Sequence, residues 1–568
     1  MLWEQRVAGS NPATPILTLA AGSRCTPMPL LFLLLLPLAC TDKESPGGVD
    51  SGVGGAEDTS AGDAADSDTA DSGAADSDTM SSGDTEAGDT DSGPVDADSD
   101  GWTADEDCDD DNPSVNPGAS EICGNGVDDD CDDLAIGCGF EDMTLRADDG
   151  LARIDGFDRS YEGGKSSFVG DINGDGFDDL VFGSPYANID GQEGRAWLLH
   201  GGDSGVLRLD RDADAWWAAN YVGNAWEGLG DVDGDGYDDF ALAAARGDGW
   251  VGVVHGPVAA GEHASATGLP AVFGGSVGAS LQRLLDIDGD DLPDLAIGAP
   301  GLTRGADALG AVLLLSGDTT GELDAAALEP VLWGEESGAS FGFAVGAGDF
   351  DGDGIGDVAV GAPSSACGED GLGALYVMAG PFAGSVDAGD AEASLCGDDA
   401  TGYLAWWVQG EADLDDDGYA ELAASVYSAG GGAGELRIWS GGPGGPDLDA
   451  PVARIYGEST FWRLGEGLEG IVDLQDDADA FFVGASSADI NGTYSGQGML
   501  VLGPVSGVLD ADDLITFSGE TSYTGVGATA SAGDWDGDGY QDLSIGATYS
   551  SLGKTWSGST WILPGSGW

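Results

Sequence analysis

The chain has 568 residues, enough for several domains, and its 104 Asp and Glu residues outnumber 17 Lys and Arg, giving a formal net charge of −87. Such a polyanion repels nucleic acid and anionic lipid head groups, which excludes both as direct ligands and leaves metal cations or basic partners. The 100 glycines favour many tight turns and argue against long helices.

An apolar run at residues 29–39 ends at Cys40 and has the length of a secretory signal core, too short to span a bilayer. Its Leu-Ala-Cys end resembles a bacterial lipobox, which implies lipidation of Cys40. Pro37 and the lack of Lys or Arg between Met28 and the run depart from that pattern. We assign residues 1–40 to the signal, with Met28 as the preferred start. The expected location is the cell surface or outer membrane, and the alternative is an ordinary secreted protein.

Residues 41–95 are almost entirely Asp, Ser, Ala, Gly and Thr. Their apolar side chains are too few to offset the entropy lost on ordering, so we expect a disordered acidic linker. Repulsion between its charges would keep the linker extended. The segment would serve as a tether or as a solubilising spacer.

Residues 96–139 form a separate small module. Little apolar content means that it needs disulfides or metal to fold. Four cysteines allow three pairings, and the sequence does not choose among them. The disulfide candidates are Cys108, Cys123, Cys131 and Cys138. Oxygen groups also occupy positions 1, 3, 5, 7 and 12 of an EF-hand-like loop, a pattern that favours Ca²⁺. These are Asp96, Asp98, Asp100, the Trp102 carbonyl and Asp107.

Residues 107–133, reading DCDDDNPSVNPGASEICGNGVDDDCDD, resemble a metal-binding motif of bacterial surface proteins that is named after a copper-binding example. The module contains neither His nor Met, so imidazole or thioether ligation of copper is unsupported. Ca²⁺, copper and a purely disulfide-held spacer remain the three interpretations.

From residue 151 onward, one acidic nine-residue pattern recurs: Asp-x-(Asp/Asn)-x-Asp-Gly-x-x-Asp. Six copies begin at residues 171, 231, 286, 349, 413 and 534, and a damaged copy begins at 473. Neighbouring copies start 55 to 64 residues apart. Asp291 replaces the sixth-position Gly in the third copy, and the fifth copy ends in Glu421. This period predicts a repeat domain over residues 151–568.

Each repeat contains four apolar segments with the length of short strands, and one of them is bracketed by glycines in every repeat. Four strands in each of seven units predict an all-β fold, a seven-bladed β-propeller. The seventh unit lacks a fourth strand, whereas residues 151–158 match that strand elsewhere. We therefore expect residues 151–158 to cross over and complete blade seven, which removes open sheet edges.

The repeats resemble the FG-GAP repeats of the integrin α-subunit propeller. Phe341-Gly342 and Gly361-Ala362-Pro363 carry the two halves of that name within one repeat. The resemblance implies Ca²⁺ loops within the blades and a role in adhesion or ligand binding, without identifying a ligand.

The loop residues themselves indicate the same cation. Carboxylate, amide and carbonyl oxygens suit Ca²⁺, and Gly at position six permits the sharp bend. Without a cation the clustered carboxylates repel one another. We predict about six Ca²⁺ sites in the propeller, with the damaged copy empty, and possible occupancy of one more in the Cys-rich module. The predicted propeller ligands are Asp171, Asn173, Asp175, Phe177, Asp179, Asp231, Asp233, Asp235, Tyr237, Asp239, Asp286, Asp288, Asp290, Leu292, Asp294, Asp349, Asp351, Asp353, Ile355, Asp357, Asp413, Asp415, Asp417, Tyr419, Glu421, Asp534, Asp536, Asp538, Tyr540 and Asp542.

The remaining Cys and His residues support few other sites. Cys367 and Cys396 flank one strand of blade four and are predicted to pair. His200 and His255 lie at equivalent strand ends, which indicates a repeated packing role. With three histidines in the chain, no nucleophile–base–orienter arrangement is supported, and we predict that the protein is not an enzyme.

These features predict an exported calcium-binding surface protein that acts in adhesion or in recognition of a protein or polysaccharide. We expect a monomer that contacts the membrane only through its lipid anchor. One alternative is a polysaccharide-acting hydrolase or lyase on a propeller scaffold, and another is a structural, calcium-responsive matrix protein.

Overall fold

The computed structural model describes residues 102, 112 and 115 and most of residues 143–565. Inside that span, the residues not described are 148, 158–161, 190–191, 220, 246–248, 264–270, 274–275, 286, 288–291, 317–321, 326–327, 368–371, 399–401, 476–477, 511–512 and 554. Several predictions therefore lie outside the described residues. They are the signal with Cys40, the linker, the four cysteines Cys108, Cys123, Cys131 and Cys138, and the module ligands Asp96, Asp98, Asp100 and Asp107.

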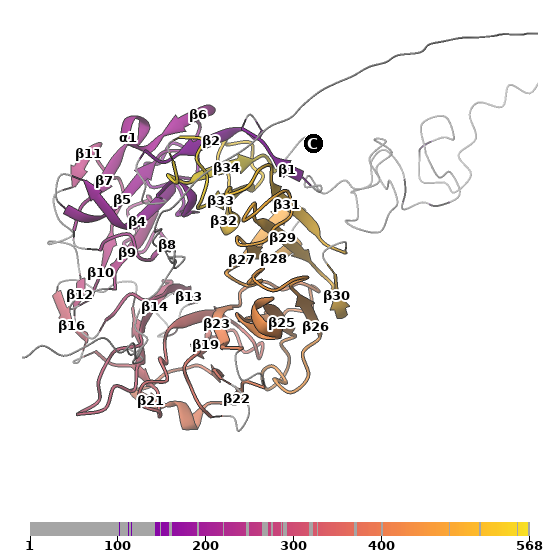
Figure 1. Cartoon of the computed structure of the whole chain (residues 1–568). Coiled ribbons are helices and arrows are strands. Elements are labelled where there is room, and N and C mark those ends of the chain that lie inside the picture. The colour runs from indigo at the N-terminus through magenta and orange to yellow at the C-terminus, as the bar shows by residue number, and fades with distance from the viewer. Residues whose placement is uncertain are drawn as a thin grey trace, which may run out of the picture. The chain divides into compact units, whose positions relative to one another are not determined.

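The described strands form seven sheets, and the fold is the seven-bladed β-propeller predicted from the repeat (Figure 1). Blade one holds β3 (Ser166–Phe168), β4 (Leu180–Ile189), β5 (Gln192–Leu199), β7 (Ala215–Trp217) and β11 (Gly261–His263). Blade two holds β8 (Trp226–Gly230), β9 (Asp239–Ala244), β10 (Trp250–Val254), β12 (Ala271–Phe273) and β16 (Glu322–Asp324). Blade three holds β13 (Leu281–Leu284), β14 (Asp294–Ala299), β15 (Ala311–Leu315), β17 (Val331–Trp333) and β21 (Ser385–Asp387).

The other four blades follow the same design. Blade four holds β18 (Ala344–Gly348), β19 (Asp357–Ala362), β20 (Ala374–Met378) and β22 (Ala393–Cys396). Blade five holds β23 (Leu404–Gln409), β24 (Leu422–Val426), β25 (Glu435–Trp439), β26 (Ala453–Tyr456) and β30 (Gly507–Leu509). Blade six holds β27 (Gly467–Gln475), β28 (Ala478–Ala485), β29 (Gln497–Leu502), β31 (Ile515–Gly519) and β1 (Met143–Leu145). Blade seven holds β32 (Val526–Gly533), β33 (Asp542–Ala547), β34 (Ser559–Leu563), β2 (Ala152–Asp155) and β6 (Gly205–Arg208).

Blade seven closes the ring by combining strands from both ends of the repeat domain. Strand β2 pairs antiparallel with β34, with Ala152 opposite Ile562, so the predicted crossover is confirmed. In Figure 1 the dark N-terminal strand β2 lies beside the yellow strand β34. The inner strands β3, β8, β13, β18, β23, β27 and β32 contact one another in this order, and β32 contacts β3. The seven sheets therefore form a closed ring.

A fifth strand, which the sequence did not predict, links most neighbouring blades. It leaves the connection between strands three and four of one blade and pairs parallel with strand four of the preceding blade. Strand β11, for example, lies between β10 and β12 of blade two but pairs with β7 of blade one. Strand β1 is the fifth strand of blade six, because it pairs parallel with β31. Residues before position 151 therefore also belong to the propeller. These pairings satisfy backbone groups at the outer edge.

The apolar core lies between neighbouring blades. Each of the seven clusters of buried apolar side chains in the described residues draws its members mainly from two adjacent sheets. Between blades three and four the sheets approach so closely that a Cβ on Gly298 would stand 2.3 Å from the carbonyl oxygen of Gly342. Gly342 itself has φ +81°, a conformation that L side chains rarely adopt. The glycines of the Gly-Ala-Pro and Phe-Gly segments thus meet across a blade interface.

Only short helical turns accompany the strands in the described part of the chain. They are η1 (Glu162–Gly164), α1 (Leu209–Asp212), η3 (Ala388–Asp390) and α2 (Ala429–Gly432). Cys367 and Cys396 of blade four form a disulfide, which confirms the predicted pair. Among the described residues no helix has the length and apolar character needed to cross a membrane.

Candidate metal centres

Each acidic loop, numbered here by its blade, joins the inner strand to the second strand, so the loops share one end of the propeller. In loop one the backbone folds around Asp171. Its Oδ1 accepts hydrogen bonds from the N–H groups of Gly174 (2.7 Å) and Asp175 (3.0 Å), and its Oδ2 from Gly176 (2.8 Å). Loops two, four and seven repeat all three bonds, and loop five repeats the last two. The repeated sequence therefore encodes one repeated loop conformation.

The backbone conformation at the sixth loop position explains why glycine recurs there. Gly176 has φ +91°, and Gly236, Gly354, Gly418 and Gly539 have φ between +83° and +92°. A side chain in this left-handed region costs about 1–2 kcal/mol, which glycine avoids.

The ninth position of each described loop carries a buried carboxylate at or next to the start of strand two. Asp179, Asp239 and Asp542 are 0% exposed, and Asp357 and Glu421 are 2% exposed. In loop one, Asp179 accepts hydrogen bonds from the N–H of Ile172 (3.1 Å) and of Gly201 (2.9 Å), which follows strand three. These bonds fix the carboxylate so that it faces the loop interior.

Burial, together with neighbouring carboxylates, raises the pKa of these ninth-position groups. The pKa of Asp179 rises to about 8, mainly by desolvation and further by the charges of Asp175 and Asp171. Desolvation raises the pKa of Asp357, Glu421 and Asp542 to about 7. A bound cation would remove this penalty because it stabilises the ionised form.

Several loop oxygens are buried without a hydrogen-bond partner, as expected of groups that ligate a metal. They are Asn173 Oδ1, Glu421 Oε1 and Asp536 Oδ1. Acidic side chains also converge, with ligand atoms within 4.8 Å of one another, in loops two, four, five and seven. These groups are Asp231–Asp233–Asp235, Asp349–Asp351–Asp353, Asp413–Asp415–Glu421 and Asp534–Asp536–Asp542. The donors are oxygens, so the residues fit a hard divalent cation.

The predicted position-seven residues lie within the loops, where their N–H groups donate to the position-five carboxylate. Phe177 bonds Asp175 at 3.2 Å, and Tyr237, Ile355, Tyr419 and Tyr540 make the same contact. Their carbonyls remain predicted ligands.

Loop three is only partly described. Asp286, Asp288, Asp290 and Asp291 lie outside the described residues. Asp294 is fully buried at the start of β14 and accepts a hydrogen bond from the N–H of Ile287 at 2.7 Å. The ninth-position group of this loop therefore keeps the geometry of the others, and Leu292 precedes it by two residues.

The chain matches the FG-GAP repeat family over residues 163–199, 277–315, 341–378 and 526–563, which contain loops one, three, four and seven. The chain contains FG-GAP repeats. Its relatives include integrin alpha-PS2 of Drosophila melanogaster, 35% identical over 160 residues, covering 24% of this chain and 11% of the relative. Integrin alpha-V of Gallus gallus is 33% identical over 230 residues, or 38% of this chain and 21% of the relative.

An enzyme also contains a similar region. Human phosphatidylinositol-glycan-specific phospholipase D is 30% identical over 298 residues, covering 47% of this chain and 34% of the enzyme. The chain spans between 11% and 34% of the length of these three relatives. Residues 107–135 separately match a family described as "Putative metal-binding motif", within the predicted Cys-rich module.

Blade six lacks an FG-GAP loop. Strand β27 ends at Gln475 and β28 begins at Ala478, and these two residues pair with each other, so the two strands leave no room for a nine-residue loop. When Gly484 is aligned with Gly183 of blade one, Asp479 falls at position eight and Ala480 at position nine. The buried ninth-position carboxylate is therefore missing from this blade.

Position eight has a separate role, which the sequence did not reveal. Asp238 of loop two accepts a hydrogen bond from the N–H of Asp171 in loop one at 2.9 Å. Asp178 contacts Asp534 of loop seven in the same way at 2.9 Å. Asp479 of blade six accepts from Asp413 of loop five at 2.7 Å. We call these contacts inter-blade clamps, because each ties the first residue of one loop to the next blade.

The two strand-end histidines have different surroundings, so the predicted shared packing role is wrong. His200 Nδ1 lies 3.6 Å from Asp214 Oδ2, away from loop one. His255 Nδ1 instead lies 3.3 Å from Asp239 Oδ2 and 3.4 Å from Asp233 Oδ2, both in loop two. His255 is a candidate site residue that the sequence pattern did not connect with loop two. The sequence held one clue to this role, because His255 directly precedes the glycine that ends strand three. The N–H of that glycine, Gly256, donates a hydrogen bond to Asp239 at 2.9 Å.

The end of the propeller opposite the loops has a different surface. Successive antiparallel strands are joined at alternate ends, so this face holds the connections between strands two and three and those between blades. Seven of the twelve most exposed large apolar side chains among the described residues lie there. These are Tyr186, Tyr456, Phe461, Ile490, Tyr523, Leu552 and Trp556. We call this surface the aromatic face.

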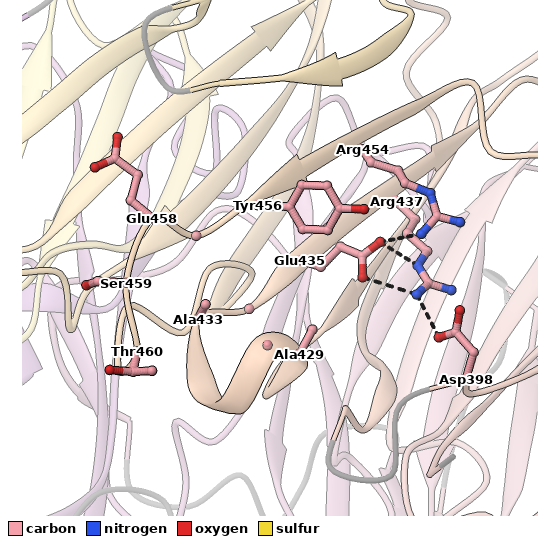
Figure 2. Close-up of a pocket in the computed structure, with 13 residues that line it drawn as sticks. Asp398, Ala429, Ala433, Glu435, Arg437, Arg454, Tyr456, Glu458, Ser459 and Thr460 are labelled. Atoms are coloured by element: carbon pink, nitrogen blue, oxygen red, sulfur yellow. Dashed lines mark hydrogen bonds and ion pairs between the residues drawn. The ribbon is translucent and has the colours of Figure 1, made fainter. Parts of the chain in front are cut away.

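A pocket of about 640 Å³ opens on the aromatic face of blade five. Its wall comes from residues 429–437 and 454–460 together with Asp398. Figure 2 shows the guanidinium groups of Arg437 and Arg454 converging on Glu435. Arg437 Nε lies 2.8 Å and Arg454 Nη1 lies 2.7 Å from Glu435 Oε1. The pocket therefore combines a buried ion network with the exposed ring of Tyr456.

Proposed function

We propose that the protein is an exported, calcium-binding surface lipoprotein whose propeller recognises a protein or polysaccharide ligand without catalysis. One observation carries this proposal: the ring has two chemically different faces. Acidic loops that fit cations occupy one end, and exposed aromatic side chains with a pocket occupy the other. One face would stabilise the blades, and the other would contact the ligand.

Calcium is the cation that the loop chemistry supports best. Carboxylate and amide oxygens supply the donors, and Ca²⁺ accepts six to eight oxygen ligands in flexible geometry, whereas Mg²⁺ demands a tighter octahedron. Two carboxylates about 4 Å apart repel by roughly 1 kcal/mol in water and by several-fold more near a protein surface. A cation bound in each loop would attract all of these carboxylates and so offset their mutual repulsion. The Cys-rich module is proposed to take Ca²⁺ as well.

The aromatic face supports recognition because aromatic side chains dominate the energetics of many interfaces. Phe461 is 67% exposed and Tyr523 is 50% exposed, on the connections that enter blades six and seven. Aromatic rings gather around Tyr523, because the ring centroid of Tyr494 lies 6.0 Å from that of Tyr523 and 6.3 Å from that of Tyr549. A contiguous apolar patch of this kind is typical of a binding surface. Integrins among the relatives make recognition a reasonable role, although their activity belongs to much longer chains.

A non-catalytic role agrees with the carboxylate chemistry. The carboxylates in the described residues that converge within 4.8 Å in groups of three lie in the loops, where cation binding accounts for them. A second set of interacting carboxylates, Glu227, Glu411 and Glu469, is buried at the inner strands, with no nucleophile and base assigned beside it. The phospholipase D relative keeps an enzymatic alternative open, namely a hydrolase or lyase acting on a polysaccharide. A structural, calcium-responsive matrix protein without a discrete ligand is the third candidate.

The proposed location follows from the sequence. Lipidation at Cys40 would anchor the chain at the cell surface, with the acidic linker holding the propeller away from the membrane. The net charge of −87 disfavours nucleic acid as a partner, and we propose a monomer in solution.

The test is binding of the full chain, in millimolar Ca²⁺, to an array of bacterial polysaccharides and purified surface proteins. We expect binding that Tyr523→Ala weakens by about 30-fold, as at an interface hot spot. Tyr540→Ala is the matched control, because Tyr540 is also 50% exposed but lies in loop seven. Equal loss in both variants would contradict the assignment of the aromatic face. Turnover of an arrayed polysaccharide would establish the enzymatic alternative.

A further inference from the structure

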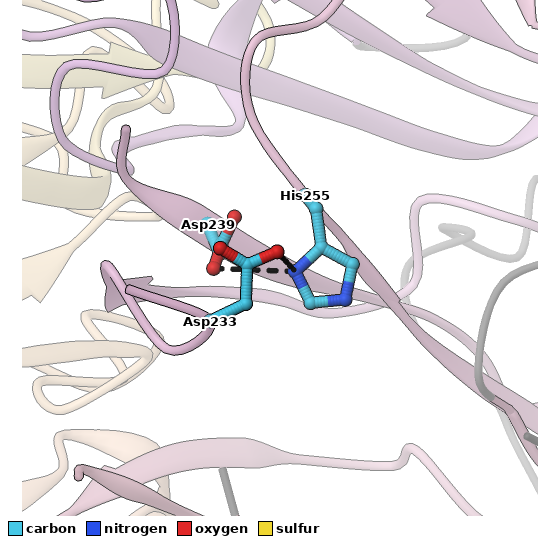
Figure 3. Close-up of side chains that lie close together, drawn as sticks. All are labelled: Asp233, Asp239 and His255. Carbon is cyan, nitrogen blue, oxygen red and sulfur yellow. Dashed lines mark ion pairs between the residues drawn. The ribbon is translucent and has the colours of Figure 1, made fainter. Parts of the chain in front are cut away.

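Loop two has an imidazole at its border that distinguishes it from the other described loops. His255 follows β10 and directs Nδ1 at two loop carboxylates, as Figure 3 shows. The corresponding residues before the glycine that ends strand three are His200, Ser316, Ala379, Ser440, Leu502 and Pro564. Of these, His200 is the one other imidazole, and its Nδ1 lies near Asp214 instead. Blade two therefore carries a local departure from an otherwise repeated site.

The surroundings of the His255 nitrogen call for a positive charge. Nδ1 is buried and has no hydrogen-bond partner, although the imidazole as a whole is 30% exposed. It lies 3.4 Å from Asp233 Oδ2 and 3.3 Å from Asp239 Oδ2. With the ring proton on Nε2, the Nδ1 lone pair is repelled by both carboxylates, and with the proton on Nδ1 neither carboxylate is aligned to accept a hydrogen bond from it. A cation held between the three atoms converts each of these contacts into an attraction.

The position of Asp239 is fixed independently of the histidine. This side chain is 0% exposed, and its oxygens accept hydrogen bonds from the N–H groups of Val232 at 3.0 Å and Gly256 at 2.9 Å. Because Gly256 follows His255 directly, the same backbone segment places both the carboxylate and the imidazole. The arrangement is thus set by the strand framework.

The separations fit ligands of a small borderline metal ion, and the nitrogen donor, rather than the spacing, distinguishes this site from a Ca²⁺ site. Two bonds of about 2.1 Å that meet at a tetrahedral angle place their ligand atoms about 3.4 Å apart. Imidazole nitrogen suits Zn²⁺, Fe²⁺ or Ni²⁺, whereas Ca²⁺ prefers oxygen ligands at longer distances. The nearby carboxylates of Asp231 and Asp235 converge with that of Asp233 and supply further oxygens.

We propose that Asp233, Asp239 and His255 form a mixed nitrogen–oxygen site in loop two that takes a first-row transition-metal dication, of the Zn²⁺ class, in preference to Ca²⁺. The site is independent of the proposed recognition role. It divides the propeller loops into two chemical kinds.

The experiment titrates Zn²⁺ into the full chain in the presence of millimolar Ca²⁺, with a fluorescent zinc indicator as competitor. The quantity measured is the difference between the wild type and His255→Ala, so that sites elsewhere, including the Cys-rich module, cancel. We expect the wild type to bind one more equivalent, with an affinity at least about 100-fold higher than the variant retains. Loss of an outer-layer partner alone weakens metal sites by about 10–100-fold.

Two further variants keep the proposal falsifiable if His255→Ala folds poorly. His255→Gln offers an oxygen in place of nitrogen, so it should lose the extra Zn²⁺ equivalent while loop two still binds Ca²⁺. His200→Ala is the matched control and should bind Zn²⁺ as the wild type does. Equal Zn²⁺ binding by the wild type and His255→Gln would overturn the proposal. Displacement of the extra Zn²⁺ equivalent by millimolar Ca²⁺ would also overturn it. The same holds if the wild type binds no extra Zn²⁺, which would mean that protonated His255 pairs with the loop carboxylates in place of a metal.

Discussion

Blades five and six are neighbours with the same order of strands, yet they connect their first two strands differently. Blade five has the nine-residue loop from Asp413 to Glu421, with its buried ninth-position carboxylate. In blade six the last residue of β27, Gln475, pairs with the first residue of β28, Ala478, and Ala480 stands in place of that carboxylate. Both sheets nevertheless keep their strands and their cores against the adjacent blades.

The comparison teaches that strand pairing and inter-blade packing do not require the loop. What blade six keeps is Asp479, which accepts the N–H of Asp413 and so clamps the loop of blade five. The loop is therefore an addition to a blade whose sheet and core form without it. A cation in the loop would stabilise the connection and its contacts with the next blade, while apolar burial stabilises the sheets.

The largest expected effect comes from removing the loop's central carboxylate. Asp413→Ala deletes the acceptor for the N–H groups of Asp417 (3.1 Å) and Gly418 (2.8 Å) and a predicted ligand. Two hydrogen bonds to a charged group contribute about 3 kcal/mol together, so the free energy of unfolding should fall by about that amount. Chemical denaturation in millimolar Ca²⁺ measures it. Asp449→Ala, an exposed residue of the same blade, is the control and should change stability by less than about 0.5 kcal/mol.

The next effect concerns the clamp that blade six retains. Asp479→Ala leaves the N–H of Asp413 without its side-chain acceptor, and we expect a loss of about 2 kcal/mol. This loss should persist when Ca²⁺ is chelated, because it acts between blades. Asp479→Asn keeps an acceptor oxygen and should recover much of the loss. If both variants matched the wild type, the clamp would carry no stability.

A smaller effect on stability comes from two buried carboxylates at the inner strands of these blades, Glu411 and Glu469. Desolvation, followed by the charge of Glu411, raises the pKa of Glu469 on β27 to about 8. Since the folded pKa lies above the unfolded value near 4.5, the unfolded chain ionises first, and this group destabilises the fold increasingly as pH rises from about 4.5 to 8. Glu469→Gln should therefore melt like the wild type at pH 5 and be more stable by on the order of 1 kcal/mol at pH 9. An equal difference at both pH values would contradict this cause.

The smallest effect is a backbone one. Ala405, the second residue of β23 in blade five, has φ +59°, whereas the equivalent residue of blade six is Gly465 with φ +84°. Ala405→Gly should raise the free energy of unfolding by about 0.5 kcal/mol, because relief of left-handed strain exceeds the entropy cost of glycine. Gly465→Ala should do the opposite and cost more, since the new Cβ would stand 2.5 Å from the Ser425 Cβ. Thermal melts of both variants check the two signs.

Much of the fold could be predicted because its signals repeat. The loop period gave seven units, and the match between residues 151–158 and a fourth strand located the closing blade. The fifth strands escaped because each is three or four residues long and pairs with a sheet from another repeat. Such short segments carry no periodicity of their own.

The candidate sites could be predicted where the chemistry is local. Asp171 and its loop neighbours lie within nine residues, so their convergence follows from the pattern. His255 lies sixteen residues after Asp239, and a strand must return before the two meet. The role of Asp479 escaped for another reason: its alignment with position eight becomes visible only once β28 is in register with the second strands of the other blades.

The central claim is that calcium in the loops stabilises the propeller, and thermal unfolding of the full chain tests it most directly. The chain is melted in EDTA, and then in millimolar Ca²⁺ or Mg²⁺. One site at a hundredfold excess of ligand over Kd stabilises by about 2.7 kcal/mol, so several loops should raise the Tm by many degrees in Ca²⁺ and by much less in Mg²⁺. An unchanged Tm would mean that the loops are acidic turns without metal, and equal shifts with both ions would mean that they bind divalent cations without preferring Ca²⁺; either result would contradict the account.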